Sequence, residues 1–498
     1  MEEFILNQIK ELTPKINQLI EKIHSDKKLK KQLEELELLL PAGDLKKLYY
    51  AFKFGADAVY AGLPYYSLRI KENKFKFDNL LKGIDYTKKL DKKIYITVNI
   101  YPRGNFNEEH FLKVIDEVYS KEADALIMSD PGLIDLVKEN FDIPIHLSVQ
   151  ANATNYLAVK FWKKQGVERV ILPRELILEE IKTIHEKVPD IELEFFVHGS
   201  ICIAYSGRCL ISAYMSKRLA NLGQCNNACR WNYRVFLEEK ERPGQLFYIE
   251  EDDFGTYFFN SRDYNLLMRI PELIDAGIIS FKVEGRNKTE YYVSVVAKVY
   301  REVIDRIKKG EQITEKEWIN YFIELEKAPH RPWLTTFMNE KSAPWLQDYN
   351  YTSSIQTFWY LGRLFGKFKD YYLLDVRHKI NVNDKIELID KENKEVVIKE
   401  IIKINKPERL AIDEFGFLID NEKNRKILES TLKEDNRRES IGGGAKVLIK
   451  LELLKGKEIK GEELLRRPKT EEELKAKPLL IALDDEKLKT LLCDCKKL

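Results

Sequence analysis

The sequence predicts an α/β protein: a (β/α)8 barrel of the TIM type with a cysteine-rich insertion, followed by a small β-barrel domain. Eight short apolar runs, each the length of a buried parallel strand, recur within about 250 residues, and amphipathic helical stretches lie between most of them. Four cysteines cluster between the seventh and the eighth run. Beyond residue 354, strand-like segments alternate with turn signals, which is typical of a small β domain.

The chain is predicted to begin with an amphipathic helical extension over residues 1–35. Its apolar residues recur at helical spacing among many charges: Ile5, Ile9, Leu12, Ile16 and Ile20. The first residues carry acid where a signal peptide needs base, and no stretch approaches the roughly 18 consecutive apolar residues of a membrane span. We therefore expect a cytoplasmic protein with no membrane partner.

The barrel domain is predicted over residues 36–305. Its strands are expected at the apolar runs 36–41, 58–62, 94–100, 125–130, 144–150, 169–174, 192–199 and 280–285. Asp44 is expected to cap the first helix between them, which Gly55 ends. Catalytic residues of such barrels gather where the strands end at their carboxyl side. The polar residues found there include Asn99, Asp130, Gln150, Asn152, Arg174, His198 and Glu284.

Three further segments follow the barrel domain. Residues 306–353 are predicted to form a helical and irregular linker that prolines punctuate. Residues 354–450 are predicted to form the small β-barrel domain, and residues 451–498 a charged, partly helical tail. For Cys493 and Cys495 in this tail we expect a frayed terminus without a bound ligand, and an extra metal or redox pair is the alternative.

Cys202, Cys209, Cys225 and Cys229 follow one another with the spacing C-x6-C-x15-C-x3-C. In a cytoplasmic protein such a cluster indicates a metal site rather than disulfide bonds. Four thiolates can hold an iron–sulfur cluster or a zinc ion. Structural zinc sites usually contain two pairs of closely spaced cysteines, whereas here only Cys225 and Cys229 are close. The spacing therefore favours iron–sulfur and leaves zinc and unliganded thiols open.

The segment EFFVHGSICIAYSGRCLIS, residues 194–212, resembles the signature of the collagenase-like peptidase family position by position. The segments ALIMSDPGLI, PIHLSVQANATN and CNNACRWNY resemble one branch of that family, the prephenate-dependent tRNA uridine 5-hydroxylation proteins. The similarity is strong from about residue 37 to 305 and looser to about 450. Leu222 replaces a residue that is usually polar, but no departure removes a cysteine.

This resemblance implies a 4Fe-4S cluster held by Cys202, Cys209, Cys225 and Cys229. It further implies hydroxylation of the wobble uridine in the anticodon loop of tRNA, with prephenate as the oxygen source instead of dioxygen, and an unidentified electron-transfer or maturation partner. Relatives act on ribosomal RNA or on quinone precursors, so the fold and the cluster do not fix the substrate.

A dicarboxylate such as prephenate is best bound by forked donors. Arg174 and Arg286, at the ends of the sixth and eighth runs, are expected to supply them together with Lys282. His198 is a candidate proton donor or a hydrogen-bond donor to the cluster, and a non-catalytic histidine is the alternative. Glu284 is a candidate general base, and an ion pair with Arg286 is its alternative.

An RNA partner would need a local basic patch, because 83 Lys and Arg residues are balanced by 81 Asp and Glu residues. Unpaired bases enter pockets that offer stacking planes and cations. The cysteine insertion, roughly residues 200–279, carries such side chains, which are Arg208, Lys217, Arg218, Arg230, Trp231 and Arg234. We expect this insertion to contact RNA; core packing for the aromatic residues and a solvated surface for the arginines are the alternatives.

Two other functions stay open from the sequence. A peptidase, as the family's name suggests, would need an activated nucleophile or an open metal site. The chain has no HExxH and no GxSxG motif, and His185-Glu186 is not followed by a second histidine. The other alternative is a non-catalytic RNA-binding protein whose cysteines hold structural zinc.

Overall fold

The structure is a computed structural model. It describes residues 3–68, 75–104, 106–201, 208–218, 220–225, 262–337, 355–434 and 436–475, and four two-residue strands between residues 237 and 256. Those strands form two antiparallel pairs, β8 (Leu237–Glu238) with β9 (Leu246–Phe247) and β10 (Glu251–Asp252) with β11 (Gly255–Thr256). None of the helices in the described part combines the length and the apolarity needed to cross a bilayer.

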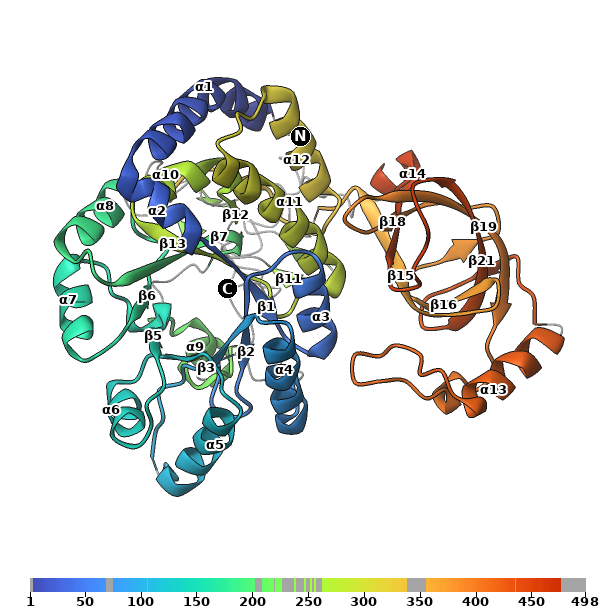
Figure 1. Cartoon of the computed structure of the whole chain (residues 1–498), viewed down its shortest axis with the longest axis horizontal. Coiled ribbons are helices and arrows are strands. Elements are labelled where there is room, and N and C mark those ends of the chain that lie inside the picture. Colours follow the sequence, from blue (N-terminus) through green and yellow to red (C-terminus); the bar gives the residue numbers. More distant parts are fainter. Residues whose placement is uncertain are drawn as a thin grey trace, which may run out of the picture.

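Eight parallel strands form a closed barrel (Figure 1). In order they are β1 (Glu37–Ala42), β2 (Ala58–Gly62), β3 (Lys93–Val98), β4 (Ala125–Met128), β5 (Ile145–Leu147), β6 (Arg169–Ile171), β7 (Glu192–Ser200) and β13 (Ile278–Val283). Each pairs with the next, and β13 pairs with both β7 and β1, which closes the ring. The predicted TIM-like barrel is confirmed, and every strand falls on one of the apolar runs.

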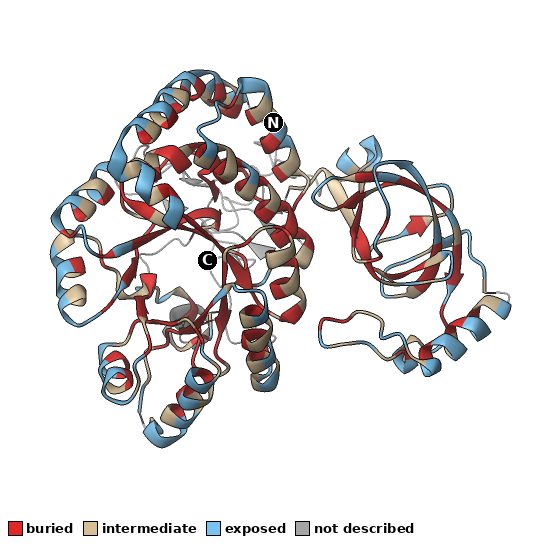
Figure 2. Cartoon of the chain, in the orientation of Figure 1, coloured by how far each residue is buried: buried red, intermediate tan, exposed pale blue. Residues whose placement is uncertain are grey.

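Helices follow the strands and surround the barrel in Figure 1. They are α3 (Leu45–Lys53), α4 (Phe77–Lys89), α5 (Glu108–Ser120), α6 (Pro131–Asn140), α7 (Tyr156–Lys164), α8 (Leu178–Lys187) and α11 (Glu290–Lys309). Asp44 caps α3 as predicted, because its side chain accepts a hydrogen bond from the backbone N–H of Lys47 at 2.9 Å. Buried residues line the strands and the inner helix faces, as Figure 2 shows.

The N-terminal extension consists of two helices, α1 (Glu3–Ser25) and α2 (Lys27–Glu35). The isoleucine face of α1 is buried against α10 (Ile270–Asp275) and α12 (Glu315–Glu326). Asn17 exchanges hydrogen bonds with the backbone of Ile313, and Gln32 on α2 donates to Ile274 O and Ile278 O. The extension is therefore part of the barrel domain's core.

The segment after β7 adds two short strands beside its carboxyl end. β12 (Asp263–Asn265) runs antiparallel to β7, and β14 (Trp333–Leu334) runs parallel to β12. A short helix, α9 (Ile211–Ser216), lies in the cysteine insertion. The insertion therefore leaves the barrel at the end of β7 and returns to it along the same strand.

The second domain is a closed antiparallel barrel of six strands, also as predicted. In their order around the barrel the strands are β15 (Phe358–Phe368), β16 (Tyr371–Val376), β21 (Lys446–Lys455), β19 (Lys394–Lys403), β18 (Lys385–Ile389) and β22 (Leu464–Pro468). The described part of the domain also contains a strand pair of β17 (Ile380–Asn381) with β20 (Ser440–Ile441), the helices α13 (Glu422–Lys433) and α14 (Glu471–Lys475), and the 3-10 helix η7 (Pro407–Arg409). Because β22 completes the barrel, the domain extends beyond residue 450, where the sequence suggested the start of a charged tail.

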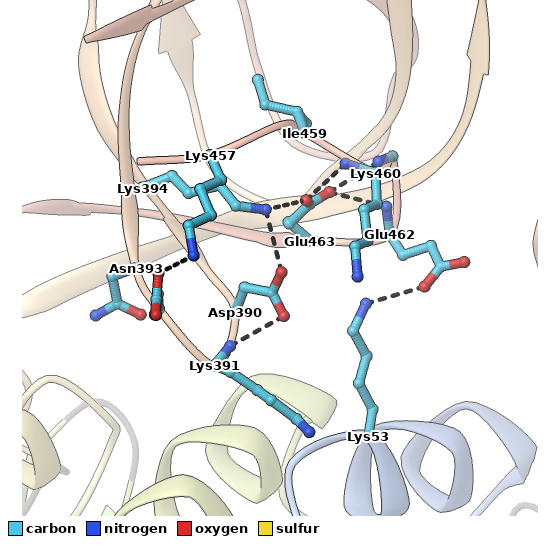
Figure 3. A network of polar contacts seen from close by, with 12 residues as sticks. Lys53, Asp390, Lys391, Asn393, Lys394, Lys457, Ile459, Lys460, Glu462 and Glu463 are labelled. Atoms are coloured by element: carbon cyan, nitrogen blue, oxygen red, sulfur yellow. Dashed lines mark hydrogen bonds and ion pairs between the residues drawn. The ribbon is translucent and has the colours of Figure 1, made fainter. Parts of the chain in front are cut away.

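The two barrels share a polar and aromatic interface. Glu462 accepts hydrogen bonds from Tyr49 and Lys53 of α3, and the pair of Lys53 with Glu462 bridges the two domains in Figure 3. On the small-barrel side, Lys394 lies between Asp390 and Glu463, at 3.1 and 2.7 Å. Because one hydrophobic cluster spans both domains through Phe415 and Leu464, the small barrel is firmly docked. Residues from both domains can therefore build one site.

Candidate active site at the barrel mouth

The carboxyl ends of β6, β7 and β13 bring together several of the predicted site residues. Arg174 Nη2 lies 3.6 Å from Glu284 Oε2, and both side chains are largely buried. The Arg174 guanidinium also lies 3.6 Å from the ring centroid of Phe196, within cation–π distance. The structure thus pairs Glu284 with Arg174, whereas the sequence suggested Arg286 as its ion-pair partner.

Lys282 lies one layer deeper, inside the barrel. Its Nζ is 2.7 Å from Glu194 Oε1 and 4.4 Å from the ring centroid of Tyr60, and the side chain is 4% exposed. Burial lowers the pKa of Lys282, and the attraction of Glu194 opposes this shift. Since Phe196 contacts Lys282 as well as Arg174, the two cations share one aromatic neighbour.

Arg286 is positioned by the backbone on both sides of it. Its Nη2 donates to Leu68 O at 2.8 Å, and its own carbonyl accepts a hydrogen bond from Lys47 Nζ at 2.9 Å. Gly43 passes so close that an added Cβ would lie 2.5 Å from the Arg286 carbonyl oxygen, so any larger residue would push this loop away. Arg286 is 7% exposed and is fixed at the mouth.

The amide and hydroxyl groups at the other strand ends mainly fix the loops. Asn99 accepts from the backbone N–H of Leu68 and donates to Ser148 Oγ at 3.2 Å. Asp130 caps α6 through the N–H of Leu133, and the carbonyl of Gln150 accepts from Tyr101. These residues hold the mouth in shape, and the structure gives them partners within the protein.

His198 points to the outer helix layer. Its ring packs against Tyr292 and Tyr300 of α11, and its Nδ1 lies 3.3 Å from the Tyr300 hydroxyl. Because that hydroxyl donates to Val197 O at 2.9 Å, its oxygen is left to accept from Nδ1–H of His198. Burial lowers the pKa of His198 to about 3, so the ring is neutral at physiological pH. Its role in catalysis stays a prediction.

Two of the four predicted cluster ligands belong to the described residues. Cys209 and Cys225 are each half-buried, and the buried Ser212 donates a hydrogen bond to Cys225 Sγ at 3.8 Å. Such a donor is typical of the surroundings of a cluster or metal thiolate. Cys202 and Cys229 lie outside the described residues, so the full quartet stays a prediction.

The predicted RNA contacts are described only in part. Arg208 and Lys217 are exposed and Arg218 is half-buried. Arg208 lies close enough to Tyr101 for its charge to lower the pKa of that phenol, although burial raises it by more. This places the insertion beside the loop that follows β3. Arg230, Trp231 and Arg234 lie outside the described residues.

A buried ionic network below the mouth was not predicted from the sequence. Arg169 pairs with Glu37 at 2.6 Å and with Glu194 at 3.3 Å, and Tyr95 donates to Glu37. Through Glu194 the network continues to Lys282. Acidic and basic residues inside strands of an otherwise apolar barrel are the signal that could have revealed it, because a buried charge requires a partner.

The comparisons with known proteins agree on one family. Residues 43–347 match the peptidase family U32. The chain is 42% identical to the tRNA hydroxylation protein P of Escherichia coli over 71% of this chain and 86% of the relative. The Haemophilus influenzae protein of the same name is also 42% identical, over 71% and 85%. A 23S rRNA 5-hydroxycytidine synthase of Escherichia coli is 32% identical over 61% of this chain and 46% of its own length. The chain therefore belongs to the peptidase family U32 and is an enzyme of that family.

Proposed function

We propose that this enzyme hydroxylates C5 of the wobble uridine in tRNA, in the cytoplasm, with prephenate as the oxygen donor. The observation that carries the proposal is the 42% identity to tRNA hydroxylation protein P along most of both chains. The cationic barrel mouth adds chemical support, because it suits an anionic co-substrate.

In this proposal Cys202, Cys209, Cys225 and Cys229 hold a 4Fe-4S cluster at the mouth. The half-buried positions of Cys209 and Cys225 and the hydroxyl beside Cys225 fit that role. When bound, the cluster supplies a redox-active or Lewis-acidic centre next to the substrate.

Arg174 and Arg286 would bind the two carboxylates of prephenate, and Lys282 would add positive charge from below. Arg174 is already oriented by Glu284 and by the face of Phe196, so little side-chain freedom is lost on binding. A carboxylate of prephenate would replace Glu284 as the partner of Arg174. Glu284 would then be available to accept a proton from the substrate.

The RNA would approach over the cysteine insertion. An anticodon loop exposes unpaired bases, so the uridine can enter the mouth without opening a duplex. Arg208, Lys217 and Arg218, together with Arg230, Trp231 and Arg234, would contact phosphates and the neighbouring bases.

Ribosomal RNA is the second candidate substrate, because the relative that modifies 23S rRNA is 32% identical. A quinone precursor, peptide hydrolysis and non-catalytic zinc-dependent RNA binding are weaker alternatives. Peptide hydrolysis in particular would need an activated nucleophile, and the sequence offers no motif for one.

Mass spectrometry of nucleosides tests the proposal. Deleting the gene should remove 5-hydroxyuridine and its derivatives from tRNA, and the wild-type gene should restore them, whereas a gene encoding Arg174→Ala should not. If the tRNA profile is unchanged but a hydroxycytidine is lost from 23S rRNA, the substrate of the enzyme is ribosomal RNA. No change in either RNA would contradict the proposal.

A further inference from the structure

A cleft of about 500 Å³ lies between the two barrels. One wall is made by the first turns of α3 and α11 and the loop before α11, and the other by the small barrel, with Tyr360, Arg377 and Glu414. Both helices begin where a barrel strand has ended, so the cleft opens on the same face of the large barrel as the mouth. Among the described residues, none that we assign to the reaction lines the cleft.

The described residues that line the cleft are mainly charged or neutral polar, and Leu45 is the one aliphatic residue among them. Four of them are cations, Lys46, Lys47, Lys288 and Arg377, and three are carboxylates, which leaves one excess positive charge. Of the acidic side chains, Asp44 is used as the cap of α3 and Glu290 accepts a hydrogen bond from Tyr360 at 2.9 Å. Pockets for small organic ligands are predominantly apolar, whereas seven of the twelve described lining residues here are charged, and their excess of one positive charge favours an anionic ligand.

Lys46 is a half-buried cation that forms no ion pair within 4 Å among the described residues, although the carboxylates of Glu290, Asp375 and Asp44 lie near enough to act on its charge. Burial lowers the pKa of Lys46 and the positive charge of Arg363 lowers it further, while the three carboxylates oppose this shift only in part. Arg363 itself is 3% exposed and donates to the backbone carbonyls of Phe415 and Gly416. Two cations therefore face each other at the domain boundary, and an anion bound between the domains would stabilise both.

The two helix starts strengthen this preference for anions. The N-termini of α3 and α11 carry partial positive charge and backbone N–H groups, which together favour phosphate, and the carboxylates of Asp44 and Glu290 at these helix starts offset part of that charge. Lys and Arg side chains, short polar side chains such as Asn and Thr, tyrosines and helix N-termini are the groups that contact nucleic-acid phosphates without reading sequence. Asn79, Asn287, Thr289 and Tyr360 supply the neutral members of that set here.

The residues that line the cleft are directly connected to the barrel mouth. Asn287 and Lys288 directly follow Arg286, and Lys47, which lines the cleft, donates to the Arg286 carbonyl at 2.9 Å. A strand of RNA held in the cleft would therefore lie next to the arginine that we assign to prephenate.

We propose that the cleft between the two barrels binds the phosphodiester backbone of the RNA substrate, with Lys46, Lys288 and Arg377 as its principal contacts. The proposal rests on the proposed function insofar as the substrate is RNA. Under this proposal the small barrel completes a clamp on the RNA, beside the nucleotide that enters the mouth. Glu414, exposed at the rim, would weaken this clamp and limit its affinity.

Binding of purified tRNA to the full-length, anaerobically purified protein tests this assignment. Lys46→Ala and Arg377→Ala should each weaken binding several-fold, and the slope of log K against log salt should become shallower by roughly 0.9 for each lost contact. Glu414→Lys should tighten binding and steepen the slope. The matched control is Lys187→Ala, at the end of α8 in a second lysine-rich hollow at the opposite end of the barrel.

Tighter binding by Glu414→Lys cannot come from misfolding, so this variant protects the test against an unstable Lys46→Ala. Unchanged tRNA affinity in the cleft variants, or an equal loss in Lys187→Ala, would overturn the cleft assignment. So would inorganic phosphate raising the melting temperature of the wild type but not of Lys46→Ala while tRNA affinity is the same in both. Nucleoside profiles test the proposed function separately. If only the cleft assignment is wrong, the cleft variants bind tRNA normally and 5-hydroxyuridine is still made. If only the proposed function is wrong, the cleft variants bind tRNA weakly but deleting the gene leaves 5-hydroxyuridine in place.

Discussion

Lys282 Nζ lies 2.7 Å from Glu194 Oε1 inside the barrel, and neither side chain is more than 4% exposed. Glu194 also lies 3.3 Å from Arg169, so one carboxylate serves two buried cations. The ion pairs connect the barrel floor to the mouth, where Phe196 contacts both Lys282 and Arg174. The network therefore determines where positive charge is available to a substrate.

Replacing Glu194 by Gln should destabilise the fold by about 3–5 kcal/mol, because it leaves the buried Lys282 without the carboxylate that it pairs with, whereas Arg169 keeps Glu37 and Glu192. The free energy of unfolding from urea titration measures this. Glu192→Gln is the matched control: Glu192 also pairs with Arg169, but its side chain is 49% exposed, so its loss should cost less than about 1 kcal/mol. Equal costs for both variants would contradict the role given to burial.

Arg174→Ala should raise the prephenate concentration needed for half-maximal hydroxylation by roughly tenfold to a hundredfold, since a charged hydrogen bond contributes about 1.5–3 kcal/mol. Arg174→Lys should recover only part of this, because lysine lacks the forked donors. In the control Arg306→Ala, an arginine near the far end of α11 that pairs with Glu317, the prephenate dependence should not change. A normal prephenate dependence in Arg174→Ala would remove Arg174 from the site.

Much of the fold could be predicted because buried parallel strands form continuous apolar runs that are visible in the sequence. The last strand of the small barrel, β22, could not be predicted from the sequence. β22 reads Leu-Leu-Arg-Arg-Pro, and two arginines suggest an exposed tail. Arg466 is nevertheless 0% exposed, because Glu324 of α12 and Glu387 of β18 both lie 2.7 Å from it. Only the docked domains bring these three side chains together.

The candidate site, too, could be predicted from the sequence only in part. Arg174 and Arg286 could be proposed from the sequence because barrel chemistry gathers at strand ends, and their role in the reaction stays a prediction. The partners of Arg174 and Lys282 could not be proposed, since Glu194 and Phe196 lie inside β7 and meet the cations only through the register of β7 beside β13. The orientation of the His198 side chain toward α11 could not be predicted from the sequence either. A shift in that register between Lys282 and Val283 accompanies its contact with α11.

Cys209→Ser and Cys225→Ser should each lower the bound iron and sulfide and weaken the visible absorbance of anaerobically purified protein, because each removes a thiolate ligand. Ser212→Ala should keep the iron content but shift the reduction potential, because a hydrogen bond to Cys225 Sγ is lost. The control is Cys493→Ser with Cys495→Ser, which should retain the full iron content. Zinc in place of iron in the wild type would contradict the cluster assignment.

Stability should fall as the pH is lowered below about 6.5, and His198 should be one of the causes. The folded-state pKa of His198 is lowered to about 3 from a usual value of 6.5, because burial disfavours the charged ring. Between these values the unfolded chain binds a proton that the folded chain excludes, so the free energy of unfolding decreases by up to about 1.4 kcal/mol per pH unit.

Urea titrations at pH 7.5 and pH 5.5 limit the effect to histidines, because the carboxylates with lowered pKa values titrate at lower pH, and the buried His146, whose pKa is also lowered by burial, contributes in the same range. His198→Gln should reduce the pH dependence over this range, and His330→Gln should reduce it further, since burial lowers the pKa of His330 to about 4. The two effects should not be fully additive, because the charge of one ring disfavours protonation of the other. An unchanged pH dependence in His198→Gln would mean that this ring takes up a proton equally in the folded and the unfolded protein, and a proton-donor role for His198 would then regain support.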